Sequence, residues 1–131
     1  MLKHRILYIE DHEDTRELIT LVLRQKDFDV TSDRTIESGI KLAEQHDFDL
    51  YLLDSWLPDG SGLDLCKRIR EFDLITPILF YSAAAYEIDK KQSLESGAQA
   101  YLIKPSNTSE LCDLVASLIS SSPKHLAQKS D

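Results

Sequence analysis

Residues that cross-link or interrupt a fold are scarce in this chain, which has two cysteines, four glycines and four prolines among 131 residues. Cys66 and Cys112 lack CxxC spacing, so the sequence indicates buried thiols rather than a disulfide framework or a thiolate metal site. The four histidines are scattered without a pair at ligand spacing, which argues against a zinc site. No apolar run approaches the ~20 residues of a membrane span, and no signal-peptide pattern opens the chain. We therefore expect a cytoplasmic protein without membrane contact.

Positive charge is also in short supply, because 15 Lys and Arg residues accompany 23 Asp and Glu residues and give a formal net charge of −8. Nucleic acids and anionic membranes bind basic surfaces, so neither is expected as a direct partner. An acidic chain suits a cation site or a partner with a basic docking surface, and simple solubility explains it equally well. Hydrophobic residues make up 42% and charged residues 29%, as in one soluble globular domain.

The chain does contain a regular alternation of short apolar runs and amphipathic segments. Strands are predicted at residues 6–9, 28–31, 50–53, 78–81 and 100–103. Helices are predicted at residues 14–26, 36–43, 61–69, 86–96 and 107–118. In the first helix Leu18, Leu21, Val22 and Gln25 recur at helical spacing, which indicates the helix. Apolar strands that alternate with helices predict an α/β fold with a doubly wound parallel sheet, covered by helices on both faces.

Side chains with useful chemistry stand at the ends of four of the predicted strands. In chain order they are Glu10, Asp11, Asp54, Ser82 and Lys104. The carboxyl ends of parallel strands meet at one edge of a sheet, where such folds bind their ligands. The sequence therefore predicts that three carboxylates, a hydroxyl and an ammonium group gather in one small patch.

Three carboxylates in one patch repel each other unless a cation lies between them. Mg²⁺ is the expected cation, with Mn²⁺ as an alternative, because both prefer oxygen ligands. The metal and Lys104 would then hold a dianionic phosphoryl group, leaving Asp54 placed for in-line attack on phosphorus. Taken one at a time, these residues also fit ordinary structural roles, such as a helix cap for Asp54. Their joint position at the strand ends favours the chemical interpretation.

Four segments carry a family resemblance: "YIED" followed by residue 11, "LLDSWLPDGSGL", "TPILFYSA" and "GAQAYLIKP". Together they resemble the receiver domain of two-component response regulators, over residues 3–120. The resemblance implies a single (βα)5 flavodoxin-like domain with a five-stranded parallel sheet of order 2-1-3-4-5. It assigns residues 1–120 to the receiver domain. We expect residues 121–131, which are polar, to form a disordered C-terminal tail.

The resemblance also implies a role for each site residue. Asp54 would accept a phosphoryl group from a phosphohistidine on a sensor histidine kinase or a histidine phosphotransfer protein. Mg²⁺ would be held by Glu10, Asp11, Asp54 and the backbone carbonyl of Trp56. Lys104 and Ser82 would contact the phosphoryl group. Ser82 and Tyr101 would act as the switch pair, and the Lys104–Pro105 peptide bond would be cis.

Three positions depart from the commonest family pattern. Glu10 replaces an aspartate and Ser82 replaces a threonine, but both keep the oxygen that the site needs. Trp56, two residues after the acceptor, is unusually bulky. One hypothesis is that its indole screens the acyl phosphate from water, and simple packing on a neighbouring loop is the alternative.

Several other functions compete with this interpretation. A magnesium-dependent aspartyl phosphatase would need a second acid at the position of Trp56, so a turnover enzyme is disfavoured. A degenerate receiver that only binds partners conflicts with the complete set of site residues. A flavodoxin-like cofactor carrier fails because the acidic loop "EDHEDT" would repel a phosphate. A receiver fragment of a larger transcriptional regulator, and a homodimer through the fourth and fifth strand–helix units, stay open.

Overall fold

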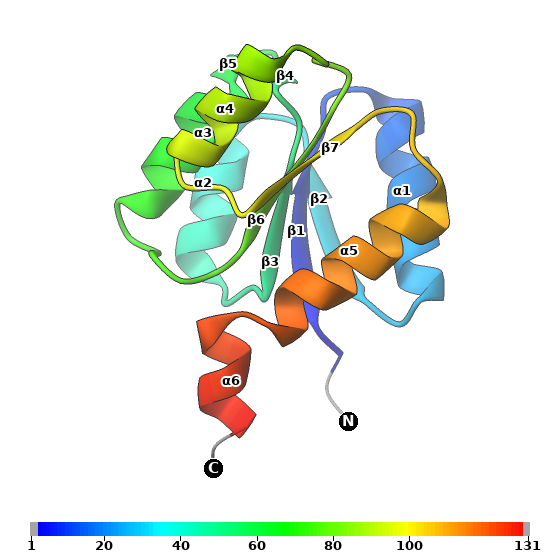
Figure 1. Ribbon diagram of the computed structural model, residues 1–131, viewed down its shortest axis with the longest axis vertical. Helices are drawn as coiled ribbons and strands as arrows, with labels where there is room; N and C mark the ends of the chain where they lie inside the picture. The colour runs from blue at the N-terminus through cyan, green and yellow to red at the C-terminus, as the bar shows by residue number, and fades with distance from the viewer. Residues whose placement is uncertain (1–2, 130–131) are drawn as a thin grey trace.

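Five apolar runs form the central sheet, because their continuous hydrophobic sequences can be buried on both faces. The computed structural model describes residues 3–129 and places this sheet between two layers of helices (Figure 1). The strands are β1 (Arg5–Ile9), β2 (Asp29–Asp33), β3 (Leu50–Leu53), β6 (Ile78–Ser82) and β7 (Ala100–Ile103). They pair in parallel in the order β2-β1-β3-β6-β7. Counted along the chain, this is the predicted order 2-1-3-4-5, so the fold prediction is confirmed.

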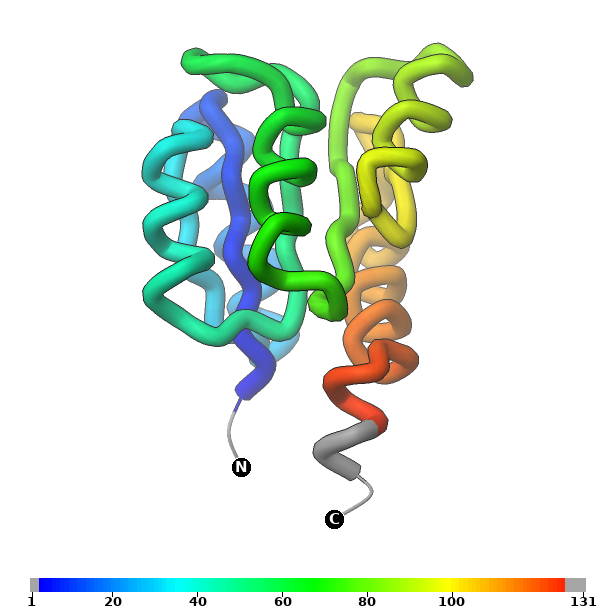
Figure 2. Tube along the Cα trace, turned by 90° about the vertical axis from the view of Figure 1, so that its left-hand side faces the viewer, coloured from blue at the N-terminus to red at the C-terminus, as the bar shows by residue number. Residues whose placement is uncertain are grey.

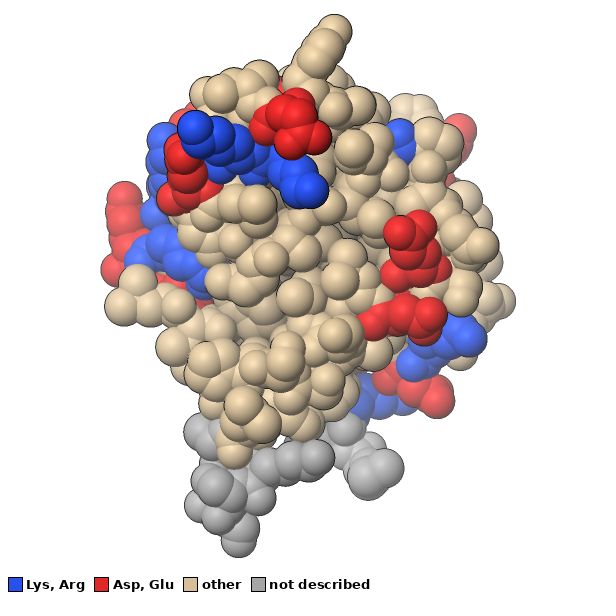
Figure 3. All heavy atoms as spheres, in the orientation of Figure 1, with Lys and Arg blue, Asp and Glu red and all other residues tan. Residues whose placement is uncertain are grey.

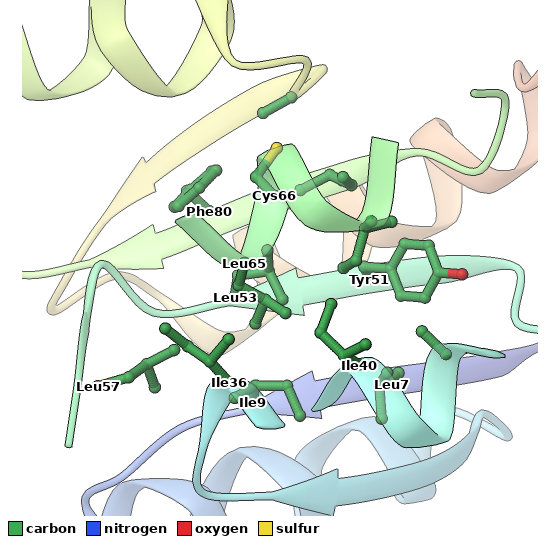
Figure 4. Close-up of a cluster of buried hydrophobic side chains, with 14 of the residues drawn as sticks. Leu7, Ile9, Ile36, Ile40, Tyr51, Leu53, Leu57, Leu65, Cys66 and Phe80 are labelled. Atoms are coloured by element: carbon green, nitrogen blue, oxygen red, sulfur yellow. The ribbon is translucent and has the colours of Figure 1, made fainter. Parts of the chain in front are cut away.

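The helices follow the strands as a doubly wound sheet requires. They are α1 (Glu13–Gln25), α2 (Ile36–Gln45), α3 (Gly62–Arg70), α4 (Glu87–Glu95), α5 (Thr108–Ser120) and α6 (Pro123–Lys129). Helices α2 and α3 cover one face of the sheet, and α1 and α5 cover the other (Figures 1 and 2). Side chains that alternate along β1 enter different cores: Leu7 and Ile9 pack under α2 and α3, whereas Ile6 and Tyr8 pack under α1 and α5. Figure 4 shows the first of these cores. Among residues 3–129, no helix is long and apolar enough to span a membrane.

The residues whose spacing indicated α1 face the core only in part. Val22 is half-buried and packs against the core, but Leu18 and Leu21 are more than half exposed, while Ile19 and Leu23 are buried against the sheet. Both pairs fit helical spacing, so periodicity alone does not choose between them. The choice follows from packing, because Ile19 and Leu23 share a core with Tyr8 of β1.

The C-terminal segment also differs from the expected disordered tail. Helix α6 occupies Pro123–Lys129, and residues 130–131 lie outside the described part of the chain. Ser122 accepts a hydrogen bond from the His125 backbone nitrogen (3.1 Å) and so caps the new helix. Lys124 pairs with the carboxylate of Asp47 and donates to the Phe48 carbonyl oxygen (2.7 Å). A cap and a lysine anchor therefore dock a segment whose polar composition alone suggested disorder.

A short hairpin, which the sequence analysis did not predict, follows β3. Its strands are β4 (Trp56–Leu57) and β5 (Gly60–Ser61), paired antiparallel. The hairpin leads into α3, where the Ser61 side chain accepts from the Asp64 backbone nitrogen as the predicted cap. Gly62 then lies so close to β3 that a Cβ atom on it would meet the Asp54 carbonyl oxygen at 2.1 Å. The start of α3 is thus packed against the backbone of the proposed acceptor.

We expect Gly62→Ala to destabilise the protein by about 2 kcal/mol or more, because a backbone oxygen cannot move aside as a flexible side chain can. Urea unfolding of the variant measures this loss. Gly39→Ala is the matched control, since its Cβ would meet side-chain atoms and no backbone atom, those of Ile9 at 3.2 Å and of Leu65 at 3.6 Å. The control should change the free energy of unfolding by less than about 1 kcal/mol. Equal effects of the two substitutions would contradict the close packing.

Candidate functional site

The strand-end residues meet at the carboxyl edge of the sheet, the upper end in Figure 1. Glu10 follows β1, Asp54 follows β3, Ser82 ends β6 and Lys104 follows β7. Because β1, β3, β6 and β7 are consecutive neighbours in the sheet, these four side chains come from one continuous stretch of its edge. The topology therefore brings together residues up to 94 positions apart in the chain.

An ion cluster forms the centre of the site. The Lys104 Nζ contacts Glu10 Oε1 and lies 3.7 Å from Asp54 Oδ2. Glu10 is 1% exposed and Asp54 is 7% exposed, so both carboxylates are largely removed from water. One ammonium group thus serves two buried carboxylates, and the cluster as a whole carries excess negative charge when both are ionised.

Backbone and side-chain donors fix each carboxylate. Glu10 Oε2 accepts from the His12 backbone nitrogen (3.2 Å), and Glu10 Oε1 accepts from the Tyr8 hydroxyl (3.4 Å). Asp54 Oδ1 accepts from the Ser55 backbone nitrogen (2.8 Å). These contacts leave Asp54 Oδ2 as the carboxylate oxygen directed toward Lys104.

The crowding of the two acids separates their pKa values. Burial raises the pKa of Asp54 to about 6, and the neighbouring Glu10 adds to this rise. Burial acts on the pKa of Glu10 in the same direction. Hydrogen bonds with Asp54 and Lys104 outweigh it and hold that pKa below its ordinary value. Asp54 is therefore the carboxyl group that takes up a proton first, while Glu10 stays ionised beside Lys104. The same burial, together with Glu10, raises the pKa of Tyr8 far above its ordinary value, so its hydroxyl stays protonated.

Asp11, the third predicted carboxylate, takes a different orientation. Its side chain is about half exposed and its Oδ1 lies 4.0 Å from the Arg34 guanidinium. Arg16 donates to the Glu10 and Asp11 carbonyl oxygens at 2.9 and 3.3 Å, which fixes the backbone here. With Asp11 so placed, residues 3–129 hold no group of three or more His, Cys, Asp or Glu side chains in position for a metal ion. The structure thus gathers Glu10, Asp54 and Lys104 but leaves Asp11 at the rim.

The two predicted switch residues are both tied to Ala84, in the loop between β6 and α4. Ser82 is fully buried, and its Oγ accepts from the Ala84 backbone nitrogen (3.1 Å). The Tyr101 hydroxyl donates to the Ala84 carbonyl oxygen. The Tyr101 ring also stacks on Phe80 with centroids 6.0 Å apart. One loop residue therefore contacts the side chains of both switch positions.

The remaining predicted features lie around the cluster. Trp56 is on β4 and its indole is 62% exposed. The Lys104–Pro105 peptide bond is cis, as expected. Sequence reasoning missed the Tyr8 hydroxyl, because the apolar run around it indicated only core packing. The sequence did contain an indication of this contact, because side chains two residues apart in an extended segment point to the same side, and Tyr8 and Glu10 are two residues apart.

The comparison with known families decides what this arrangement is. A family model described as the response regulator receiver domain matches residues 6–116. The chain belongs to this family. It is therefore a signalling domain of two-component systems, and the predicted function class is confirmed.

Receiver domains of longer regulators are similar to this one in sequence. The cell cycle transcriptional regulator CtrA of Caulobacter vibrioides is 35% identical over 122 residues, which cover 92% of this chain and 52% of that protein. The response regulator ArlR of Staphylococcus saprophyticus is 32% identical over 120 residues, covering 92% and 54%. The chain thus spans about half the length of these curated relatives.

Solved receiver domains share the fold closely. The non-phosphorylated HemR receiver domain of Leptospira biflexa has a TM-score of 0.84 and 34% identity, covering 90% of this chain and 95% of that one. The receiver domain of the sensor histidine kinase PA1611 of Pseudomonas aeruginosa has a TM-score of 0.85 and 28% identity, covering 92% and 100%. The PA1611 structure holds a magnesium ion coordinated in its active-site cleft.

The raised pKa of Asp54 gives a prediction about stability. The folded receiver disfavours the ionised carboxylate, so folding loses stability as the pH rises from 3.8, the ordinary pKa, through about 6. In magnesium-free solution above pH ~7, Asp54→Asn should be more stable than wild type by about 2 kcal/mol. Below pH ~4 the difference should vanish, as urea unfolding across this range would show.

Asp59→Asn is the matched control, and it is expected to change the free energy of unfolding in the opposite direction. Asp59 accepts from the Ile36 and Glu37 backbone nitrogens at 2.9 and 3.2 Å, and these bonds lower its pKa. Its ionised form therefore supports folding above the ordinary pKa and loses that effect as the pH falls. Asp59→Asn should lower stability at neutral pH. A stability loss from Asp54→Asn under the same conditions would contradict the crowding of Asp54.

Proposed function

We propose that this receiver domain accepts a phosphoryl group on Asp54, from a phosphohistidine on a sensor histidine kinase or a histidine phosphotransfer protein. The observation that supports this most directly is the position of Asp54 Oδ2, 3.7 Å from the Lys104 ammonium group at the carboxyl edge of the sheet. An ammonium so placed can contact both the carboxylate and an incoming phosphoryl oxygen.

Mg²⁺ is the proposed cofactor, and the chemistry of the site fits it. Glu10 and Asp54 supply buried carboxylate oxygens, the ligand type that Mg²⁺ prefers, and their excess negative charge calls for a further cation. Glu10, Asp11, Asp54 and the Trp56 backbone carbonyl would hold the ion, with Mn²⁺ as a substitute. The exposed Asp11 carboxylate lies 4.0 Å from the Arg34 guanidinium, a distance at which the ion pair is weak, so a turn of the side chain toward the cluster would cost little. When bound, the ion would neutralise charge on the phosphoryl oxygens.

The transfer itself needs little from the protein beyond position and charge. An oxygen of Asp54 forms a bond to phosphorus while the phosphorus–nitrogen bond of the donor histidine breaks. The electron pair of the broken bond stays on the imidazole. Lys104 stabilises the charge that develops on the phosphoryl oxygens, and the Ser82 hydroxyl can donate to one of them. Trp56 stands where a phosphatase of the Asp-x-Asp type would carry its second acid, so the chain offers no general acid there.

The product would act as a switch through Ala84. If Ser82 turns toward the phosphoryl group, it gives up its bond with the Ala84 nitrogen, and Tyr101 is bound to the same residue. The change then reaches α4, where Ile88 and Leu94 are exposed, and β7, where Ile103 is exposed. Figure 3 shows that the centre of this face is uncharged, with acidic residues to its right and acidic and basic residues at its upper left. We propose that output partners, or a second copy of the chain, bind this face in a phosphorylation-dependent manner.

Incubation with acetyl phosphate and Mg²⁺, followed by intact-mass measurement, tests the proposed acceptor. Wild type should gain one labile phosphoryl adduct, which should be largely lost when the metal is chelated. Asp54→Asn should gain none, because its amide is not a nucleophile toward phosphorus.

Asp59→Asn serves as the control, because it removes a carboxylate from the neighbouring hairpin without touching the ion cluster. It should be labelled like wild type. An adduct that persists on Asp54→Asn, or that is lost from Asp59→Asn, would contradict the assignment.

A further inference from the structure

Two buried tyrosines lie behind the ion cluster, on the side of the sheet covered by α1 and α5. Tyr8 belongs to β1 and is fully buried, and Tyr81 belongs to β6 and is 5% exposed. Both are members of the same hydrophobic core. Their rings suit that core, but a phenol hydroxyl in an apolar interior needs a hydrogen-bond partner.

The two hydroxyl groups have different partners. The Tyr8 hydroxyl donates to Glu10 Oε1 (3.4 Å), the same oxygen that Lys104 contacts. The Tyr81 hydroxyl accepts from Ser106 Oγ (3.3 Å) and has no such contact with Glu10. Tyr81 instead presents its ring to the Lys104 Nζ, which lies 5.5 Å from the ring centroid. Only the Tyr8 hydroxyl therefore acts directly on the carboxylate.

We propose that Tyr8 is a positioning residue that orients Glu10 as a ligand for Mg²⁺, an inference that rests on the function proposed above. Glutamate is longer than aspartate by one methylene and has one more rotatable bond, so its carboxylate needs more restraint to stay in a fixed place. Tyr8 and Lys104 restrain Oε1, and the His12 backbone nitrogen restrains Oε2. Oε2, which accepts from one donor, keeps a lone pair for a cation.

The strand geometry explains why Tyr8 can take this role. Residues two apart on a strand project to the same side. Glu10 directly follows β1, and its backbone nitrogen donates to the Asp33 carbonyl oxygen (3.0 Å), so the pairing with β2 continues to Glu10 and keeps it on the same side as Tyr8. The phenol is rigid and enclosed by the core, and it brings a donor to a fixed point. Hydrogen bonds that orient a ligating carboxylate in this way typically change metal affinity by 10- to 100-fold when they are removed.

Magnesium titration of Tyr8→Phe tests the proposal, because the substitution removes the hydroxyl and keeps the ring in the core. Isothermal calorimetry or the fluorescence of Trp56, the single tryptophan, gives the dissociation constant. We expect the Kd of Tyr8→Phe to rise about tenfold. Tyr51→Phe is the matched control: it also loses a buried hydroxyl bonded to a carboxylate, that of Asp73 (2.8 Å), outside the cluster. Its Kd for Mg²⁺ should equal that of wild type.

The same substitution in a Glu10→Gln protein distinguishes an effect of Tyr8 on Glu10 from a general disturbance of the fold. If Tyr8 acts through Glu10, then Tyr8→Phe should cause no further loss of Mg²⁺ affinity in a Glu10→Gln protein. An unchanged Kd for Tyr8→Phe in the wild-type background would overturn the proposal, as would an equal loss in the Glu10→Gln background. If wild type itself fails to bind Mg²⁺, the proposed function fails. If wild type binds and Tyr8→Phe binds equally well, only the role of Tyr8 fails.

Discussion

One ammonium group shared between two buried carboxylates is the interaction on which the site depends. Lys104 contacts Glu10 and lies 3.7 Å from Asp54, and it cannot fully compensate both. The difference appears in the pKa values, since burial and Glu10 raise that of Asp54 to about 6 while Glu10 stays readily ionised. A carboxylate held with uncompensated charge is prepared for a divalent cation and for a phosphoryl group.

The paired strands and the packed cores hold the two buried carboxylates close together, although their charges repel. Parallel pairing fixes the ends of four strands at one edge, and apolar cores on both faces hold the strands in register. Gly62 allows the start of α3 to pack against the Asp54 backbone. Tyr8 reaches the cluster from the opposite core. Stability gained by burying apolar side chains therefore offsets the cost of crowding like charges.

Sequence patterns were sufficient for the alternation of strands and helices and for the grouping of Glu10, Asp54 and Lys104, because apolar runs and strand ends are local signals that topology converts into position. The order of the strands came from the family resemblance. Sequence patterns did not predict the buried face of a helix where two faces had equally apolar residues. Periodicity allowed two apolar stripes on α1, and packing chose the one containing Ile19. The orientation of Asp11 and the docking of α6 depend on side-chain contacts between distant segments, which one-dimensional patterns do not contain.

The most direct test of the central claim is a crystal structure of the protein with Mg²⁺ and beryllium trifluoride, a mimic of the phosphoryl group. The account predicts the beryllium bonded to an oxygen of Asp54, with Lys104 and the Ser82 hydroxyl on its fluorine atoms and Asp11 turned inward onto the metal. A complex with the anion elsewhere, or with Lys104 still paired only with Glu10, would contradict it.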